Sequence, residues 1–327
     1  SAAMVMARGG MRVLVVERGE FPGSKNVMGG VLYRRPTEEV VPGFWREAPL
    51  ERPITEHRLW ILSDDSMVGL AYKEGNGALS PGPSGPPGGS EERGPSDEAG
   101  GSPGEGGDPT ASAPNSFTVF RARFDRWYAE QARKAGALIL TETVVTHLLK
   151  ESGRVVGVRT DRPEGDVLAG VVVVADGANS LVTEAADLRP KLKPSQVALA
   201  VKEVISLPRE KIEDRFNLEK GQGVTIEMVG AATRGMFGTA FIYTNTDSLS
   251  VGVGVLLSAL TGSGSGPHDL IEALKAHPVV RPLLEEGKTQ EYLAHWIPEG
   301  GYRGMPTLYA DGVMVAGDAA QMVNALR

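Results

Sequence analysis

Two short β-branched runs, each ending in a turn of small residues around one aspartate, constrain the fold of this chain most. The first spans residues 171–180 and contains Asp176, and the second spans residues 313–320 and contains Asp318. A buried parallel strand that ends at a ligand crevice has this form. Small residues let backbone N–H groups approach a phosphate, and an aspartate can accept hydrogen bonds from ribose or ribityl hydroxyls. Two such turns predict a nucleotide cofactor lying across a doubly wound sheet.

The opening residues add a third element of the same kind. Residues 1–10 predict a short helix ended by glycines, and residues 11–19 form an apolar run that ends at Glu17. In dinucleotide-binding units such an acid binds the adenosine ribose about 20 residues after the glycine fingerprint. Counting back places the fingerprint before Ser1, so we expect the chain to begin inside the first helix of a Rossmann unit. The alternative is an amphipathic hairpin ending in a surface Glu-Arg pair.

Charge and composition exclude several functional classes. The net charge of −7 argues against a general nucleic-acid binder, and 41% hydrophobic residues indicate a globular protein. No apolar run reaches the roughly 18 residues needed to span a bilayer, so we expect a soluble or peripheral protein. With zero cysteines among the 327 residues, they contain no disulfide, thiolate zinc site or iron–sulfur cluster. Electron chemistry here must belong to an organic cofactor.

The remaining pattern predicts an insertion and a second sheet. Residues 74–116 are rich in Gly, Pro, Ser and acids, which predicts a disordered insertion between two strands, with an interdomain linker as the alternative. Apolar residues at helical spacing predict a helix over 123–136. From Leu188 onward alternating runs predict an antiparallel sheet, and the chain returns to the first domain at Leu308.

Six segments carry a resemblance to a known family: residues 13–18, 22–33, 121–137, 175–178, 295–302 and 316–320. Their pattern is similar to that of the large FAD-dependent group of aromatic hydroxylases, geranylgeranyl reductases and electron-transfer-flavoprotein:quinone oxidoreductases. Within that group the chain looks most like the FixC-type flavoproteins.

The resemblance implies an α/β fold with a Rossmann-type FAD-binding domain and an inserted α+β antiparallel-sheet domain. The implied division is residues 1–73 and 117–187 for the FAD-binding domain, 74–116 for the insertion, 188–307 for the substrate or quinone-side domain, and 308–327 for the return. It also implies that Asp318 binds a ribityl hydroxyl and that Glu17 binds the adenosine ribose. The full set of implied cofactor-binding residues is Glu17, Arg18, Lys25, Asn26, Gly29, Gly30, Arg121, Val145, Asp176, Gly177, Gly317, Asp318 and Ala319.

Other interpretations of these residues stay open. Arg123 competes with Arg121, and Asp176 before glycine is also an ordinary turn residue. His295 and Tyr302 flank a Pro-Glu-Gly-Gly turn where either could contact a quinone, although a core histidine is equally compatible with the sequence. No base, nucleophile and oxyanion donor are grouped, which suits a protein whose cofactor carries the electrons.

The function implied by the resemblance is electron transfer. We expect an FAD-dependent oxidoreductase that takes electrons from an electron-transfer flavoprotein and passes them to a quinone, with a ferredoxin-like protein as a further partner. We expect a cytoplasmic location, with peripheral contact on the inner face of the cell membrane as a possibility. The alternatives are a geranylgeranyl-reductase-like flavoprotein that reduces isoprenoid double bonds, and a cofactor-free interaction subunit.

Overall fold

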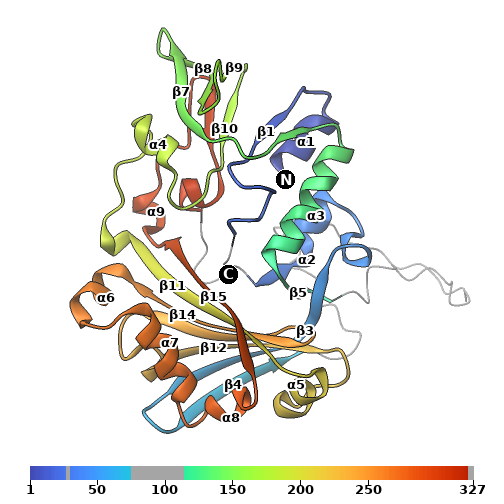
Figure 1. Ribbon diagram of the computed structural model, residues 1–327, viewed down its shortest axis with the longest axis vertical. Coiled ribbons are helices and arrows are strands. Elements are labelled where there is room, and N and C mark those ends of the chain that lie inside the picture. Colours follow the sequence, from blue (N-terminus) through green and yellow to red (C-terminus); the bar gives the residue numbers. More distant parts are fainter. Residues whose placement is uncertain (27–29, 75–113, 323–327) are drawn as a thin grey trace, which may run out of the picture.

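The computed structural model describes residues 1–26, 30–74 and 114–322. Within them three small sheets gather at one end of the molecule and one large sheet forms the other (Figure 1). This mixed α/β architecture confirms the expected combination of a Rossmann-type region with a second, sheet-forming region.

The small sheets are two parallel ladders, one of them extended by an antiparallel strand, and one antiparallel meander. Their strands pair as β1 (Leu14–Val16) with β6 (Leu138–Leu140), β10 (Val172–Val174) with β17 (Val313–Val315) and β16 (Tyr309–Ala310), and β7 (Val145–Glu151) with β8 (Arg154–Thr160) and β9 (Asp166–Leu168). The expected runs therefore form parallel strands, and each ends at its acidic turn. Glu17 follows β1, Asp176 follows β10 and Asp318 follows β17.

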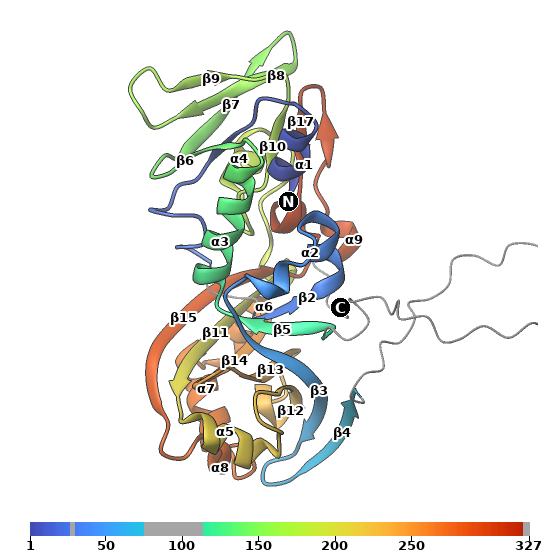
Figure 2. The ribbon, with the colours of Figure 1, turned by 90° about the vertical axis from the view of Figure 1, so that its right-hand side faces the viewer.

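The large sheet has nine strands and is strongly curved (Figure 2). From one edge it runs β15 (Lys288–Pro298), β11 (Val197–Ser206), β14 (Ser248–Leu256), β13 (Gly238–Thr244), β12 (Gly223–Gly230), β3 (Leu50–Leu62), β5 (Ser116–Val119) and β2 (Val31–Tyr33), with β4 (Met67–Lys73) also paired to β3. Its ladders are antiparallel except for the parallel pair of β12 and β3. One face packs on helices around apolar side chains such as Ile226, Val251 and Ile271.

Helices cover the outer face of the large sheet and one side of the small sheets. They are α1 (Ala2–Arg8), α2 (Arg34–Val40), α3 (Arg121–Lys134), α4 (Leu181–Ala185), α5 (Arg209–Phe216), α6 (Leu257–Ser263), α7 (Pro267–Ala276), α8 (Arg281–Leu284) and α9 (Gly301–Gly304), with 3₁₀ turns at 44–46, 194–196, 231–233 and η4 (Gly317–Ala320). In α3, Phe124, Tyr128 and Ala132 recur every four residues and so share one face. None of the helices in the described ranges is both long enough and apolar enough to cross a membrane.

The strands of the large sheet do not follow the division expected from the sequence. That division places residues 50–73 in the FAD-binding domain, but β3 pairs with β12 and β4 pairs with β3 in the large sheet. The difference has a physical reason, since local pattern identifies a strand but strand pairing depends on distant segments. Most of the expected insertion, residues 75–113, lies outside the described residues.

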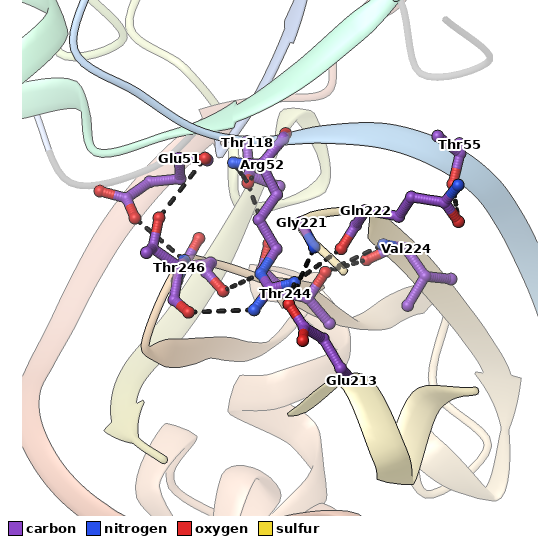
Figure 3. Close-up of polar contacts among 11 residues, drawn as sticks. Glu51, Arg52, Thr55, Thr118, Glu213, Gly221, Gln222, Val224, Thr244 and Thr246 are labelled. Atoms are coloured by element: carbon purple, nitrogen blue, oxygen red, sulfur yellow. Dashed lines mark hydrogen bonds and ion pairs between the residues drawn. The ribbon is translucent and has the colours of Figure 1, made fainter. Parts of the chain in front are cut away.

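Arg52 on β3 ties the large sheet together from within (Figure 3). Its guanidinium is 2% exposed and donates to the carboxylate of Glu213 on α5 at 3.0 Å. It also donates to the backbone carbonyls of Asn245 at 2.6 Å, Gln222 at 2.8 Å and Thr246 at 3.0 Å. Four acceptors thus surround one buried cation, which joins β3, α5 and the β13–β14 turn.

Candidate functional site

Three of the expected cofactor residues converge on His295. This histidine on β15 is half-buried, and burial lowers the pKa of its imidazole. The carboxylate of Asp318 acts in the opposite direction, and the cations Arg121 and Arg18 lower the pKa further. Because such influences fade over about 10 Å at ordinary salt, the four side chains share one locality. They come from β15, η4, α3 and the end of β1.

Asp125 fixes Arg121 and the preceding loop to one another. Arg121, the first residue of α3, donates from Nε to Oδ1 of Asp125 at 2.8 Å and from Nη2 to Oδ2 at 2.9 Å. Asn26 donates from Nδ2 to the same Oδ2 at 2.6 Å. Gly23 has φ +97°, and a Cβ there would lie 2.6 Å from Cβ of Asp125. The loop can therefore pack on α3 only with glycine at this position.

The turn after β17 has the form that a cofactor hydroxyl requires. Gly317 has φ +65°, and a Cβ at that position would meet no atom within 4 Å. Asp318 is exposed, and its carboxylate accepts no hydrogen bond within the described part of the chain. Ala319 is fully buried behind it in η4. A carboxylate with available acceptor positions beside open backbone fits the ribityl chain of FAD.

Glu17 and Arg18 differ in how much of each side chain remains available to bind a cofactor. Oε1 of Glu17 accepts the backbone N–H of Gly19 at 2.6 Å, and its backbone carbonyl accepts from Thr143 at 3.1 Å. One carboxylate oxygen is thus engaged in shaping the turn, which leaves Oε2 for a ribose hydroxyl. Arg18 is exposed beside it. The acid at the end of β1 is therefore preoriented.

The loop expected beside the flavin ring is described only in part. Lys25 is exposed, and Gly29 lies outside the described residues. Gly30 is buried, and a Cβ there would lie 2.8 Å from Cδ2 of Tyr243. The ring of Tyr243 stacks on Phe241 with centroids 4.5 Å apart. Gly30 therefore lets the loop approach an aromatic pair on β13.

The structure engages Asp176 in its own turn. Its Oδ1 accepts the hydroxyl of Ser180 at 2.6 Å, and Oδ2 lies 3.5 Å from the backbone N of Val182 in α4. Gly177 has φ +83°, as an Asp-Gly turn requires. Val145 pairs with Thr160 and packs on the apolar cluster of the small sheets. None of these contacts joins the group around His295, so their cofactor roles stay predictions.

Two residues of this locality escaped the sequence reasoning. Asp125 lies four residues after Arg121, a spacing at which an ion pair on one helix face is expected. Lys202 stands inside the apolar run of β11 and is 5% exposed. Burial lowers the pKa of Lys202, Glu291 opposes this shift, and Arg121 adds to it. The sequence feature that could have identified Lys202 is a lysine in the middle of an apolar β-strand.

Two hollows elsewhere on the surface contain none of the expected residues. One of about 250 Å³ is lined by Lys275, Arg281 and neighbouring residues. Another of about 490 Å³ is lined by Ser63, Arg234 and neighbouring residues. The chemistry gathered around His295 is therefore separate from both.

Comparison with known proteins assigns this chain to a family. The family model described as FAD dependent oxidoreductase matches residues 99–258. Protein FixC of Bradyrhizobium diazoefficiens is 44% identical over 327 residues, which is 100% of this chain and 68% of that protein. Protein FixC of Escherichia coli strain K12 is 39% identical over 322 residues, which is 98% of this chain and 67% of that protein.

Solved structures share the fold. A geranylgeranyl bacteriochlorophyll reductase-like protein from Thermoplasma acidophilum matches with a TM-score of 0.71 at 20% identity, over 98% of this chain and 68% of that chain. The myxobacterial FAD-dependent halogenase CndH matches with a TM-score of 0.66 at 20% identity, over 99% of this chain and 66% of that chain. At these identities the match speaks for the fold alone, whereas the curated relatives carry the assignment. The chain belongs to the FixC family and is an FAD-dependent oxidoreductase.

Proposed function

We propose that this flavoprotein takes electrons from an electron-transfer flavoprotein partner and passes them to a quinone, with a ferredoxin-like protein as a further partner. FAD, when bound, supplies the electron-carrying chemistry. The protein's own residues bind it: Asp318 accepts a ribityl hydroxyl, Glu17 accepts from the adenosine ribose, and Arg121 bonds the phosphate or ribityl region. The convergence of Asp318, Arg121 and Arg18 around His295 supports one shared cofactor site.

An exposed apolar face on β3 and β4 is the observation that favours a membrane quinone as the electron acceptor. Leu59 pairs with Leu70, Ile61 with Val68 and His57 with Tyr72, so these side chains share one face of the sheet. The apolar members are 40–69% exposed: Leu59, Ile61, Val68, Leu70 and Tyr72. Exposed apolar patches of this kind mark interaction surfaces. We assign this face to contact with the membrane that holds the quinone.

A reconstituted electron-transfer assay tests the proposal. The full-length protein is mixed with reduced electron-transfer flavoprotein and a short-tail quinone, and quinol formation is followed optically. Quinol should form only when both the partner and the flavin-loaded protein are present. A flavin-loaded full-length protein that forms no quinol from the reduced partner would refute the proposal.

A second candidate function follows from the structural comparison. The Thermoplasma acidophilum match is called geranylgeranyl bacteriochlorophyll reductase-like, which favours reduction of isoprenoid double bonds as the alternative activity. The same purified protein can be offered geranylgeranyl substrates with a chemical reductant. Saturation of these double bonds, together with no quinol in the first assay, would replace the electron-transfer proposal.

The cofactor site has its own test in Asp318→Ala. Removing a charge-assisted hydrogen bond to a ribityl hydroxyl should weaken FAD binding by about one to two decades, from a loss of roughly 1.5–3 kcal/mol. FAD titration of the apoprotein measures this, with circular dichroism as the folding control. Asp311→Ala, at an exposed aspartate just before β17, is the matched control and should bind FAD normally. Unchanged FAD affinity in folded Asp318→Ala would withdraw the assignment.

A further inference from the structure

The side chain of Lys202 is 5% exposed and makes no hydrogen bond within the described part of the chain, while its ammonium nitrogen keeps a small contact with solvent. Its neighbours show which face of β11 carries it: Val201 belongs to the helix-covered core, and the Glu203 carboxylate binds Lys275 of α7 at 3.0 Å. Lys202, between them, therefore points to the opposite face, toward Arg121. Removing most of a cation's side chain from water without an acceptor in the protein is unfavourable, so we expect a group with this environment to serve a ligand.

One row of side chains connects Lys202 with the exposed apolar face. Strand register places Lys202 opposite Gly252, Gly252 opposite Phe241, and Phe241 opposite Glu227. Glu227 in turn lies opposite Leu59, which pairs with Leu70 at the sheet edge. Five strand spacings of about 4.8 Å make this row about 24 Å long. It runs from a buried cation, past Glu227, to exposed leucines.

An aromatic side chain stands next to the ammonium group. A Cβ on Gly252 would collide with Cζ of Phe241, so the Phe241 ring lies over this glycine. Phe241 stacks on Tyr243, which contacts Gly30 in the loop expected beside the flavin. A hydrogen-bond donor and a stacking surface are therefore adjacent, as recognition of a flat ring with a carbonyl oxygen requires.

We propose that Lys202 binds the quinone: its ammonium group donates a hydrogen bond to a carbonyl oxygen of the quinone ring, Phe241 contacts the ring, and the apolar tail follows the row toward β3 and β4. This inference rests on the proposed function, because it assigns the position of the acceptor within it. It gives Lys202 a binding role and requires no proton or electron transfer by the lysine.

Quinone binding by the full-length, flavin-loaded protein tests this inference. The probe is a ubiquinone analogue with a single isoprenoid unit, and its dissociation constant is measured by fluorescence quenching. Lys202→Met should raise the dissociation constant about 10- to 100-fold, because a charged donor is lost. Lys202→Gln keeps one N–H donor and should show a smaller increase. Lys288→Met, at an exposed lysine on β15 of the same sheet, is the matched control and should bind as the wild type does.

Each remaining outcome decides against the inference in a distinct way. Wild-type quinone affinity in both Lys202 variants overturns the role of Lys202 while leaving electron transfer to quinone intact. A shifted flavin reduction potential in Lys202→Met together with wild-type quinone affinity would place the ammonium group on the flavin and also overturn the inference. A wild-type protein that neither binds nor reduces the probe refutes the proposed function itself. Circular dichroism verifies folding, and Lys202→Gln decides alone if Lys202→Met does not fold.

Discussion

Arg52 and Lys202 are both cations buried in the large sheet, and they differ in every contact. Arg52 is 2% exposed and donates to one carboxylate and three backbone carbonyls. Lys202 is 5% exposed, and no described residue accepts a hydrogen bond from it. The protein supplies every acceptor for the first cation, whereas the second depends on solvent or a ligand for its hydrogen bonds.

The contrast teaches how to separate structural from functional buried charge. A satisfied cation holds its neighbours in place and is costly to remove, since its acceptors are left unsatisfied. A largely buried cation without acceptors in the protein costs stability, and such a group is a candidate for binding a ligand. Arg52 and Lys202 are almost equally buried, so the presence or absence of hydrogen-bond acceptors distinguishes them.

The largest expected effect is that of Arg52→Met. The Glu213 carboxylate and three carbonyls would lose their donor, so the free energy of unfolding should fall by about 3–5 kcal/mol. Urea denaturation followed by circular dichroism measures this. Arg154→Met, at an exposed pair with Asp311, should change stability by less than about 1 kcal/mol. If Arg52→Met lost no more stability than Arg154→Met, the contrast between Arg52 and Lys202 would be wrong.

Lys202→Met should act in the opposite direction. Without quinone present, removal of a largely buried charge that has no acceptor in the protein should increase the free energy of unfolding by about 1 kcal/mol. The same denaturation experiment applies, and Lys288→Met should stay within about 0.5 kcal/mol of the wild type. A destabilised Lys202→Met would show that this ammonium group has a stabilising partner, which would make the two cations alike.

The pH dependence of the difference in unfolding free energy between Lys202→Met and the wild type tests the comparison further. Burial holds the pKa of Lys202 below its ordinary value of 10.5, against the opposing effect of Glu291 and with that of Arg121. Between the lowered pKa and 10.5 the unfolded chain binds the extra proton, so wild-type stability rises with pH there. The advantage of Lys202→Met should therefore shrink as pH approaches 10.5. Parallel denaturation curves from neutral pH upward measure it, and a constant or growing difference contradicts the assigned burial.

The smallest expected effect concerns Glu213, the acidic partner of Arg52. The backbone N–H of Gly221 lowers the pKa of Glu213, and Arg52 adds to this, while desolvation opposes it. The stabilisation is present above the ordinary pKa of about 4.5 and is lost as pH falls through the lowered value. Glu213→Gln should therefore flatten the acid side of the stability profile. An unchanged acid slope would mean that Arg52 relies on its carbonyl acceptors alone.

Local patterns predicted the parts of the site that depend on few neighbouring residues. The runs that became β1, β10 and β17 are recognisable because β-branched residues and a small-residue acidic turn are adjacent in sequence. The FixC-type resemblance and the FAD cofactor followed from the same segments. Asp318 at its turn needs only this local chemistry.

The remaining parts depend on pairing between distant segments. The parallel pairing of β3 with β12 depends on residues more than 160 positions away. The same limit hid Lys202, since the sequence does not say which element covers each face of β11. Asp125 could have been found from its spacing to Arg121, whereas its bond to Asn26 required the folded loop.

The parallel pair of β3 and β12 has a topological consequence. The chain enters the large sheet at β2, β3, β4 and β5, leaves it for the small sheets, and re-enters at β11, so neither end of the molecule is made from one continuous segment. Excision of residues 188–307 would take β12 away from β3 and expose the ladder groups of β3 and its core-facing side chains to water. Each end of the molecule is built from separate segments of the chain, so we expect the two ends to fold as one cooperative unit. Gene fusions or truncations that treat them as separable modules should yield aggregated protein.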